Sequence, residues 1–229
     1  FILLSFVIIF FNFYYQMIEQ TKSKQRIADH GEVFTSKREV NAMLDLVKQE
    51  TERIDSRFLE PACGTGNFLV EILNRKLKIV RDRYKKSQIE FERNAIIAIS
   101  SIYGVDILQD NAIECRDRLF EIFDGIYTRL YKSDCKEDCR ASVKFLLNRN
   151  ILWGDALDFT NPETKEPIVF SEWSAINGSM IKRRDYVFKF LVEQTHQFSM
   201  FNDEGNPAAI DEPVKDYPIT HFLKIAEYA

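Results

Sequence analysis

The chain has 229 residues, which is enough for one α/β domain with a full-sized hydrophobic core. Hydrophobic residues make up 45% of the chain and charged residues 29%, which is ordinary for a soluble globular protein. The formal net charge of −4 argues against a strongly basic protein that wraps nucleic acid, but it is compatible with a local basic face.

Four cysteines lie along the chain without a disulfide-framework pattern, which predicts reduced thiols in a cytoplasmic protein. Cys135 and Cys139 have the spacing of half a zinc site. None of the three histidines lies near a second cysteine pair, so no metal site is predicted. The cysteines are Cys63, Cys115, Cys135 and Cys139, and the histidines are His30, His196 and His221.

The first 16 residues form an apolar leader that differs in composition from the rest of the chain. The apolar run is shorter than the roughly 20 residues of a spanning helix, and it lacks the basic region and cleavage site of a signal peptide. The chain begins with Phe1, and the first methionine is Met17. We interpret residues 1–16 as translated upstream DNA and not as native protein. A short membrane anchor and a buried strand or helix are the alternatives.

In chain order, residues 18–30 are polar and mixed in charge and predict a helix or a loose arm. The next predicted element is a helix that begins after a capping-box pattern, with Ser36 followed three residues later by Glu39. A short buried strand begins at Phe58. A Gly-x-Gly turn follows it, and then apolar residues at helical spacing predict a helix over about 67–74.

Residues 75–93 are strongly charged and predict an exposed helical excursion. A second strand is expected within 95–107, ending near Asp106, and a helix over 111–131. After a polar connection, a third strand is expected around 150–153. This alternation of strands and helices predicts an α/β fold with a mainly parallel sheet.

Beyond Phe159 the signal weakens, and residues 181–191 form the only clear helical stretch there. The sequence therefore divides into a core over 17–160 and a C-terminal segment of uncertain role over 161–229. The basic cluster at 180–184 is interpreted as a solvated helix face, with contact to DNA phosphates as the alternative.

The glycine turn points to a ligand, because a Gly-x-Gly turn between a strand and a helix lets backbone approach a nucleoside or an anion closely. Leu69 stands where a dinucleotide site has its third glycine, which disfavours NAD. Asp106 and Asp155 follow the second and third strands, where they can bind ribose hydroxyls and an adenine amino group. The alternative is that both acids only cap the helices that follow them.

Four segments in this order resemble the N6-adenine DNA methyltransferases that serve as modification subunits of restriction systems. They are HGEVFTSKREVNAML (30–44), FLEPACGTGNFL (58–69), IYGVDILQDNAIECRDRL (102–119) and ILWGDAL (151–157). The resemblance implies a Rossmann-like methyltransferase fold, incomplete at its C-terminus, that binds S-adenosylmethionine and double-stranded DNA in the cytoplasm. It implies that Phe34 and Thr35 contact the methionine moiety of the cofactor, and that Glu60, Gly64 and Gly66 line its amino and carboxylate side.

The same resemblance implies that Asp106 and Ile107 hold the ribose and flank the adenine, whereas Asp155 and Ala156 face the adenine edge. The family's catalytic segment, (Asn/Asp)-Pro-Pro-aromatic, is absent from this sequence. Its nearest matches begin at Asn161 and Asn206 and share only the first two letters, so turn formation is the interpretation for both and the catalytic residues stay unknown.

Three explanations account for a cofactor half without a catalytic half: a fragment, one chain of a split enzyme, or a subunit that has lost activity. The function expected is adenine N6-specific DNA methylation by a fragment or a split subunit. The rival is an inactive subunit that binds the cofactor or DNA and pairs with a partner chain. Methylation of RNA or protein is a third option.

Overall fold

The structure is a computed structural model that describes residues 24–30, 33–190 and 212–227, so the interpretation of the 1–16 leader lies outside the described residues. The chain divides into two compact units, Phe1–Gln49 and Glu50–Ala229. The first unit contains helices α2 (Lys24–His30) and α3 (Lys37–Asp45). The predicted capping box is confirmed, because the Ser36 hydroxyl accepts from Glu39 N at 3.4 Å and the Glu39 carboxylate accepts from Ser36 N at 3.2 Å.

The second unit contains the predicted parallel sheet. Strands β1 (Phe58–Glu60), β2 (Ile102–Asp106) and β3 (Ile151–Trp153) pair in parallel in the order β1-β2-β3. A pair of helices joins each strand to the next: α5 (Asn67–Tyr84) with α6 (Gln88–Ser100), and α7 (Gln109–Tyr131) with α8 (Glu137–Asn150). The short helix α4 (Lys48–Thr51) precedes β1. The mixed α/β class and all three strand positions are therefore confirmed.

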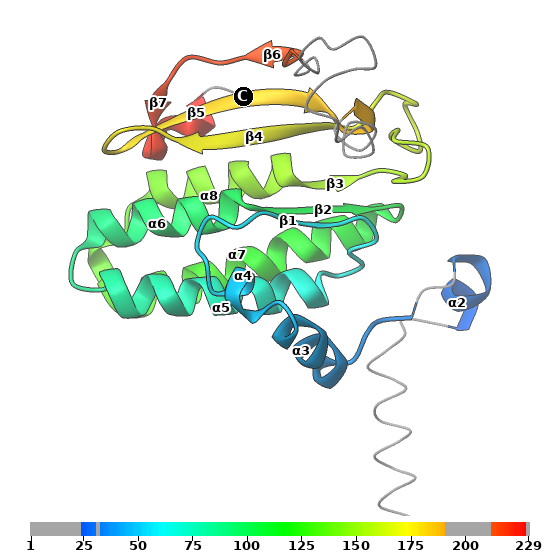
Figure 1. The fold of residues 1–229 in the computed structure, drawn as a ribbon, viewed down its shortest axis with the longest axis horizontal. Coiled ribbons are helices and arrows are strands. Elements are labelled where there is room, and N and C mark those ends of the chain that lie inside the picture. The colour runs from blue at the N-terminus through cyan, green and yellow to red at the C-terminus, as the bar shows by residue number, and fades with distance from the viewer. Residues whose placement is uncertain (1–23, 31–32, 191–211, 228–229) are drawn as a thin grey trace, which may run out of the picture. The chain divides into compact units, whose positions relative to one another are not determined.

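Helices α6 and α8 run almost directly into β2 and β3, so they extend beyond the amino ends of the strands, and α5 and α7 lie beneath both (Figure 1). At 1.5 Å per residue, α5 is about 27 Å long, whereas a three-residue strand spans only about 10 Å. The helices are thus longer than the strands, and beyond the sheet they bury their apolar faces against one another. The expectation that 75–93 is exposed is wrong, because Leu77, Val80 and Phe91 are fully buried in this helical layer.

The C-terminal segment forms a second, antiparallel sheet, which the sequence did not predict. Strand β4 (Val169–Ala175) pairs with β5 (Met180–Val187), and β5 also pairs with β6 (Lys215–Asp216) and β7 (Thr220–His221). The 3-10 helix η2 (Phe222–Glu227) follows. The predicted helix over 181–191 is wrong for its described strand residues, since burial alternates along β5 with the period of two that a strand requires.

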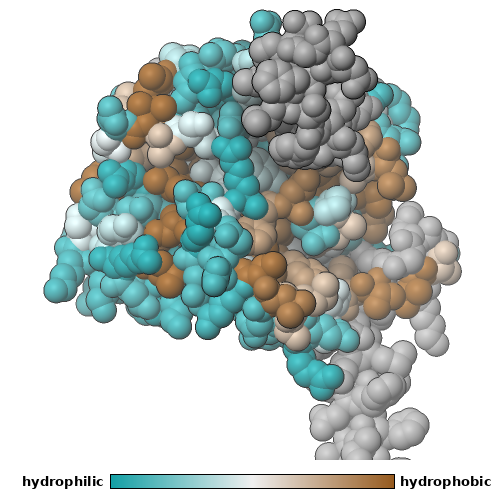
Figure 2. Space-filling view, viewed as in Figure 1, coloured by the Kyte–Doolittle hydropathy of each residue, from teal (hydrophilic) through white to brown (hydrophobic). Residues whose placement is uncertain are grey.

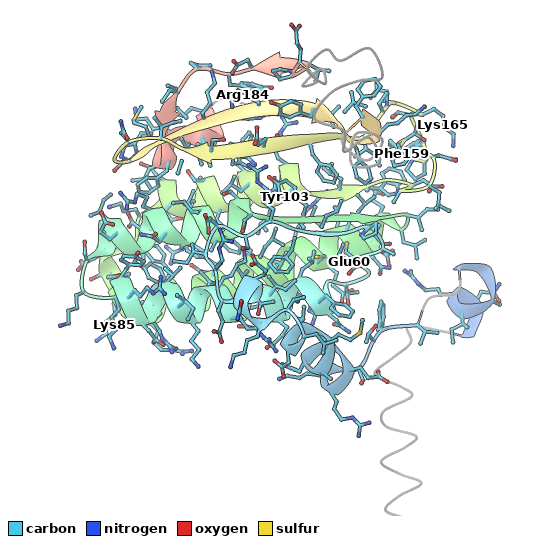
Figure 3. The ribbon with its side chains drawn as sticks, in the orientation of Figure 1. Glu60, Lys85, Tyr103, Phe159, Lys165 and Arg184 are labelled. Carbon is cyan, nitrogen blue, oxygen red and sulfur yellow. The ribbon has the colours of Figure 1, made fainter. Side chains whose placement is uncertain are left out.

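The antiparallel sheet packs over one face of the parallel sheet. Tyr103 projects from β2 toward β4 (Figure 3) and donates its hydroxyl to the backbone oxygen of Ser171 at 3.0 Å. Its ring meets Phe170 edge to face at 5.4 Å. The two sheets share an apolar cluster, which consists of Tyr103, Val105, Ile168, Phe170 and Phe188. The sheet predicted to be mainly parallel is thus one of two sheets.

The basic cluster at 180–184 lies on strand β5, so its interpretation as a helix face is wrong. Arg183 is 4% exposed and forms an ion pair with Asp185 at 2.7 Å. Lys182 pairs with Asp216 at 2.5 Å. These paired charges do not form the open basic surface that phosphate contacts require.

No helix in the described part of the chain combines the length and apolarity needed to cross a membrane.

Candidate functional site

The carboxyl ends of the three parallel strands meet at one edge of the sheet, as the strand order requires. Cys63 N, beyond β1, donates to Val105 O at 2.9 Å, and Gly154 N, beyond β3, donates to Asp106 O at 2.9 Å. The Trp153 indole donates to Ile107 O at 3.0 Å. These contacts join the glycine turn, the end of β2 and the end of β3 into one continuous edge.

Asp106 holds this edge together through its carboxylate, which is 7% exposed. Its Oδ2 accepts from Gly64 N at 2.7 Å, and its Oδ1 accepts from Leu108 N at 2.9 Å and from the Asn111 side chain at 3.2 Å. A carboxylate has about four acceptor positions. The observed arrangement therefore leaves one position, enough for one ribose hydroxyl and not for two.

The glycine turn adopts backbone conformations that favour glycine. Gly64 has φ 53° and Gly66 has φ 88°, both in the left-handed region. A Cβ added at Gly66 would lie 2.5 Å from Cys115 Sγ, so packing alone also demands glycine there. Helix α5 begins directly after Gly66 without a side-chain cap. The positive end of α5 therefore lies at the turn, where it favours an anionic group.

Helix α7 supplies three residues to the turn that the sequence did not assign to the site: Asn111, Cys115 and Arg118. They recur at positions i, i+4 and i+7, which place them on one helix face. Asn111 contacts Asp106, Cys115 lies under Gly66, and Arg118 donates to oxygens of Thr65 and Asn67. This spacing was the only sequence signal that the three residues share a face of α7. It could not show that this face packs against the glycine turn.

Glu60 lies at the end of β1, beside the turn (Figure 3). Its carboxylate is half-buried, and burial raises its pKa, opposed by a hydrogen bond from Ala62 N. No cationic side chain of the described residues pairs with Glu60. A partly desolvated carboxylate in this position favours a ligand that brings an ammonium group or another donor.

Asp155 begins a turn after β3 and is half-buried. Its Oδ1 accepts from Leu157 N at 2.8 Å and from Asp158 N at 3.4 Å, so it caps this turn. The capping alternative expected a helix after Asp155, and no helix lies between β3 and β4. Among the described residues nothing donates to its Oδ2, which stays open to a ligand. Ala156 packs beside the apolar cluster between the sheets.

Two exposed apolar side chains follow these acids closely in the chain. Ile107 is 50% exposed and Leu157 is 88% exposed. By contrast, hydrophilic side chains cover most of the helical half of this unit on the face that Figure 2 shows. Exposed apolar side chains beside a few polar acceptors are typical of a site for a nucleoside base.

Asn161 forms a turn, as expected. Its Oδ1 accepts from Glu163 N at 2.9 Å and from Thr164 N at 3.0 Å, and its Nδ2 donates to Trp153 O at 3.3 Å. These bonds occupy the atoms that a catalytic asparagine would present to a base. Asn206 lies outside the described residues. Phe34 and Thr35 belong to the other compact unit, so their contact with the turn stays a prediction.

The cysteines are free thiols, and three of them are buried. A hydrogen bond with Cys115, together with burial, raises the pKa of Cys63. Burial likewise raises the pKa of Cys139. Cys135 contacts the backbone oxygen of Tyr127 at 3.5 Å. Within the described ranges, no group of three or more His, Cys, Asp or Glu side chains could hold a metal ion.

No protein-family model matches the chain, and neither a curated protein nor a solved structure matches it. The residues at the sheet edge and the four sequence segments are therefore the features of the chain that point to a function.

Proposed function

We propose that this chain binds S-adenosylmethionine at the glycine turn and forms the cofactor half of an adenine N6-specific DNA methyltransferase with a Rossmann-like core. The observation that carries the proposal is the left-handed Gly64–Gly66 turn, fixed by the Asp106 carboxylate at the carboxyl edge of a parallel sheet. Ligands of open parallel sheets bind at this edge. The order of the four motif segments favours a methyl donor over NAD.

The residues at the edge fit the methionine end of this cofactor. The Glu60 carboxylate, which has no cationic partner among the described residues, suits its ammonium group. The uncapped start of α5 suits its carboxylate, because the first turn of a helix presents N–H donors and a positive dipole end. When bound, the cofactor supplies a methyl group on a sulfonium centre.

The residues at the edge also fit the nucleoside end of the cofactor, except that Asp106 can bind one ribose hydroxyl and not two. Asp106 has one acceptor position left, so it binds one ribose hydroxyl while it holds Gly64 N and its neighbours. The exposed Ile107 side chain flanks the adenine ring, and Ala156 faces the adenine edge. The open Oδ2 of Asp155 accepts from the adenine amino group.

Methyl transfer to DNA requires a second part. Transfer to an adenine amino group depends on positioning and polarising that group after the base is flipped out of the duplex. The (Asn/Asp)-Pro-Pro-aromatic segment that does this is absent from the sequence, and Asn161 is occupied in a turn. A partner chain or a longer form of the protein supplies the segment, and the complex acts on double-stranded DNA in the cytoplasm.

The alternative is a subunit that binds the cofactor without catalysis, and the occupied Asn161 favours it for the chain alone. Incubation with duplex DNA and a methyl-labelled cofactor tests this point. The chain alone should transfer no label. Labelled N6-methyladenine would show that the catalytic residues are present and would overturn the division into two halves.

Isothermal titration calorimetry tests the binding step directly. The chain should bind S-adenosylmethionine and S-adenosylhomocysteine with one site, and NAD should not compete. Absence of heat with both cofactor forms, or displacement by NAD, would overturn the proposed function.

A further inference from the structure

Arg118 of helix α7 contacts the glycine turn on both sides of Gly66. Its Nη1 donates to Thr65 O at 2.6 Å, to Thr65 Oγ1 at 2.9 Å and to Asn67 Oδ1 at 3.0 Å. Thr65 is 5% exposed, so water does not readily replace the guanidinium as its partner. One charged group therefore satisfies the polar atoms of a nearly buried turn.

The charge of Arg118 is directed at the turn and not at an acid. No carboxylate of the described residues forms an ion pair with it. Arg140, in contrast, pairs with Asp124 at 2.6 Å and with Glu137 at 2.5 Å. The half-buried guanidinium of Arg118 donates its hydrogen bonds to the turn, so its role is different from that of a surface ion pair.

The turn is thus held from two sides. Asp106 accepts from Gly64 N, and Arg118 donates to Thr65 and Asn67. Between these contacts Gly66 is left-handed, and α5 begins without a side-chain cap. Glycine gives the turn access to many backbone conformations, so external contacts must select the one that directs the start of α5 toward a ligand.

We propose that Arg118 is a positioning residue of the cofactor site, which holds Thr65–Asn67 in the conformation that the cofactor binds. This inference rests on the proposed function and adds a residue that acts on the ligand through the turn. It predicts that loss of Arg118 weakens binding by the same factor for every ligand that uses the turn.

The test compares Arg118→Met with Arg118→Lys, which keeps a cationic donor, and with Arg129→Met as control. Arg129 is exposed on the same helix, about 16 Å further along its axis. Hydrogen exchange of the ligand-free chain reports the Gly64, Gly66 and Val70 amides, each of which has a hydrogen-bond acceptor. Calorimetry then compares S-adenosylmethionine with its decarboxylated form.

In Arg118→Met, the three amides should exchange at least tenfold faster, with unchanged protection in α8. Arg118→Lys should recover part of the lost protection, and Arg129→Met should behave as the unmutated chain. Both cofactor forms should bind about tenfold more weakly. Unchanged exchange at the turn, faster exchange throughout, or no recovery with lysine would overturn the proposal. Weakening confined to the carboxylated form would also overturn it, since Arg118 would then contact the ligand directly. The exchange experiment needs no ligand, so it separates failure of this inference from failure of the proposed function.

Discussion

Asp106 accepts three hydrogen bonds from two sides of the proposed site, so its substitution is the sharpest test of how the site is built. The carboxylate accepts from Gly64 N, Leu108 N and the Asn111 side chain. Asp106→Ala removes all three bonds. Asp106→Asn keeps the shape, but its NH₂ group must face at least one of these donors in either orientation.

The magnitude follows from these contacts. A hydrogen bond to a charged group contributes about 1.5–3 kcal/mol, and an orphaned buried donor costs a similar amount. Asp106→Asn keeps at best two of the bonds, so its unfolding free energy should fall by about 2 kcal/mol. Asp106→Ala leaves three donors, of which Asn111 is fully buried, and should lose about 4 kcal/mol.

Urea unfolding followed by circular dichroism measures both values. Asp158→Asn is the matched control, because Asp158 is an exposed acid on the same edge of the sheet, and its variant should stay within about 0.5 kcal/mol of the unmutated chain. If both Asp106 variants unfold at the same urea concentration as the control, the carboxylate does not hold the turn.

Two further predictions concern the same unit. Burial lowers the pKa of Lys76 to about 7, while its Nζ donates to Ser101 Oγ at 2.5 Å and to backbone oxygens near it. Above pH 7 the unfolded state therefore binds more protons than the folded state, and stability should rise from pH 7 to about pH 10, by at most about 5 kcal/mol. Lys76→Met should lack this rise in urea unfolding at each pH, and parallel profiles for the two proteins would contradict the burial argument. Gly178 also has a positive φ, 65°, but it has open space around it, so Gly178→Ala should cost about 1–2 kcal/mol. Gly66→Ala should destabilise the chain by more than this. Adding Cys115→Ala to Gly66→Ala should restore part of the melting temperature, whereas no restoration would show that contact with Cys115 is not what excludes a side chain.

The sheet edge was predictable because its signals are local. A strand of apolar residues, a Gly-x-Gly turn and an acid at each later strand end all follow from short-range chemistry and from the geometry of parallel strands. Residues 95–100 were harder, since AIIAIS is buried as the end of α6, and a short apolar run reads equally as strand or helix.

The antiparallel sheet was missed for a related reason. Along β5, Arg183 and Asp185 occupy inward positions where apolar residues would have shown the strand period. Their charges are satisfied by each other within β5 and by Ser171 of β4. No local pattern reveals the contact with the neighbouring strand. The hydrogen bonds from Arg118 to the turn were also not predictable, because they depend on how α7 packs against the turn. The helical spacing of its neighbours indicated only a shared face.

The location of the cofactor is the central claim, and glycine-selective ¹⁵N labelling tests it most directly. The chain has eight glycines, so its amide spectrum is small enough to follow residue by residue. On titration with S-adenosylmethionine, the amides of Gly64 and Gly66 should shift and saturate together, while those of Gly125 and Gly178 should stay in place. A spectrum that does not change, or shifts at Gly125 or Gly178 without shifts at the turn, would contradict the account.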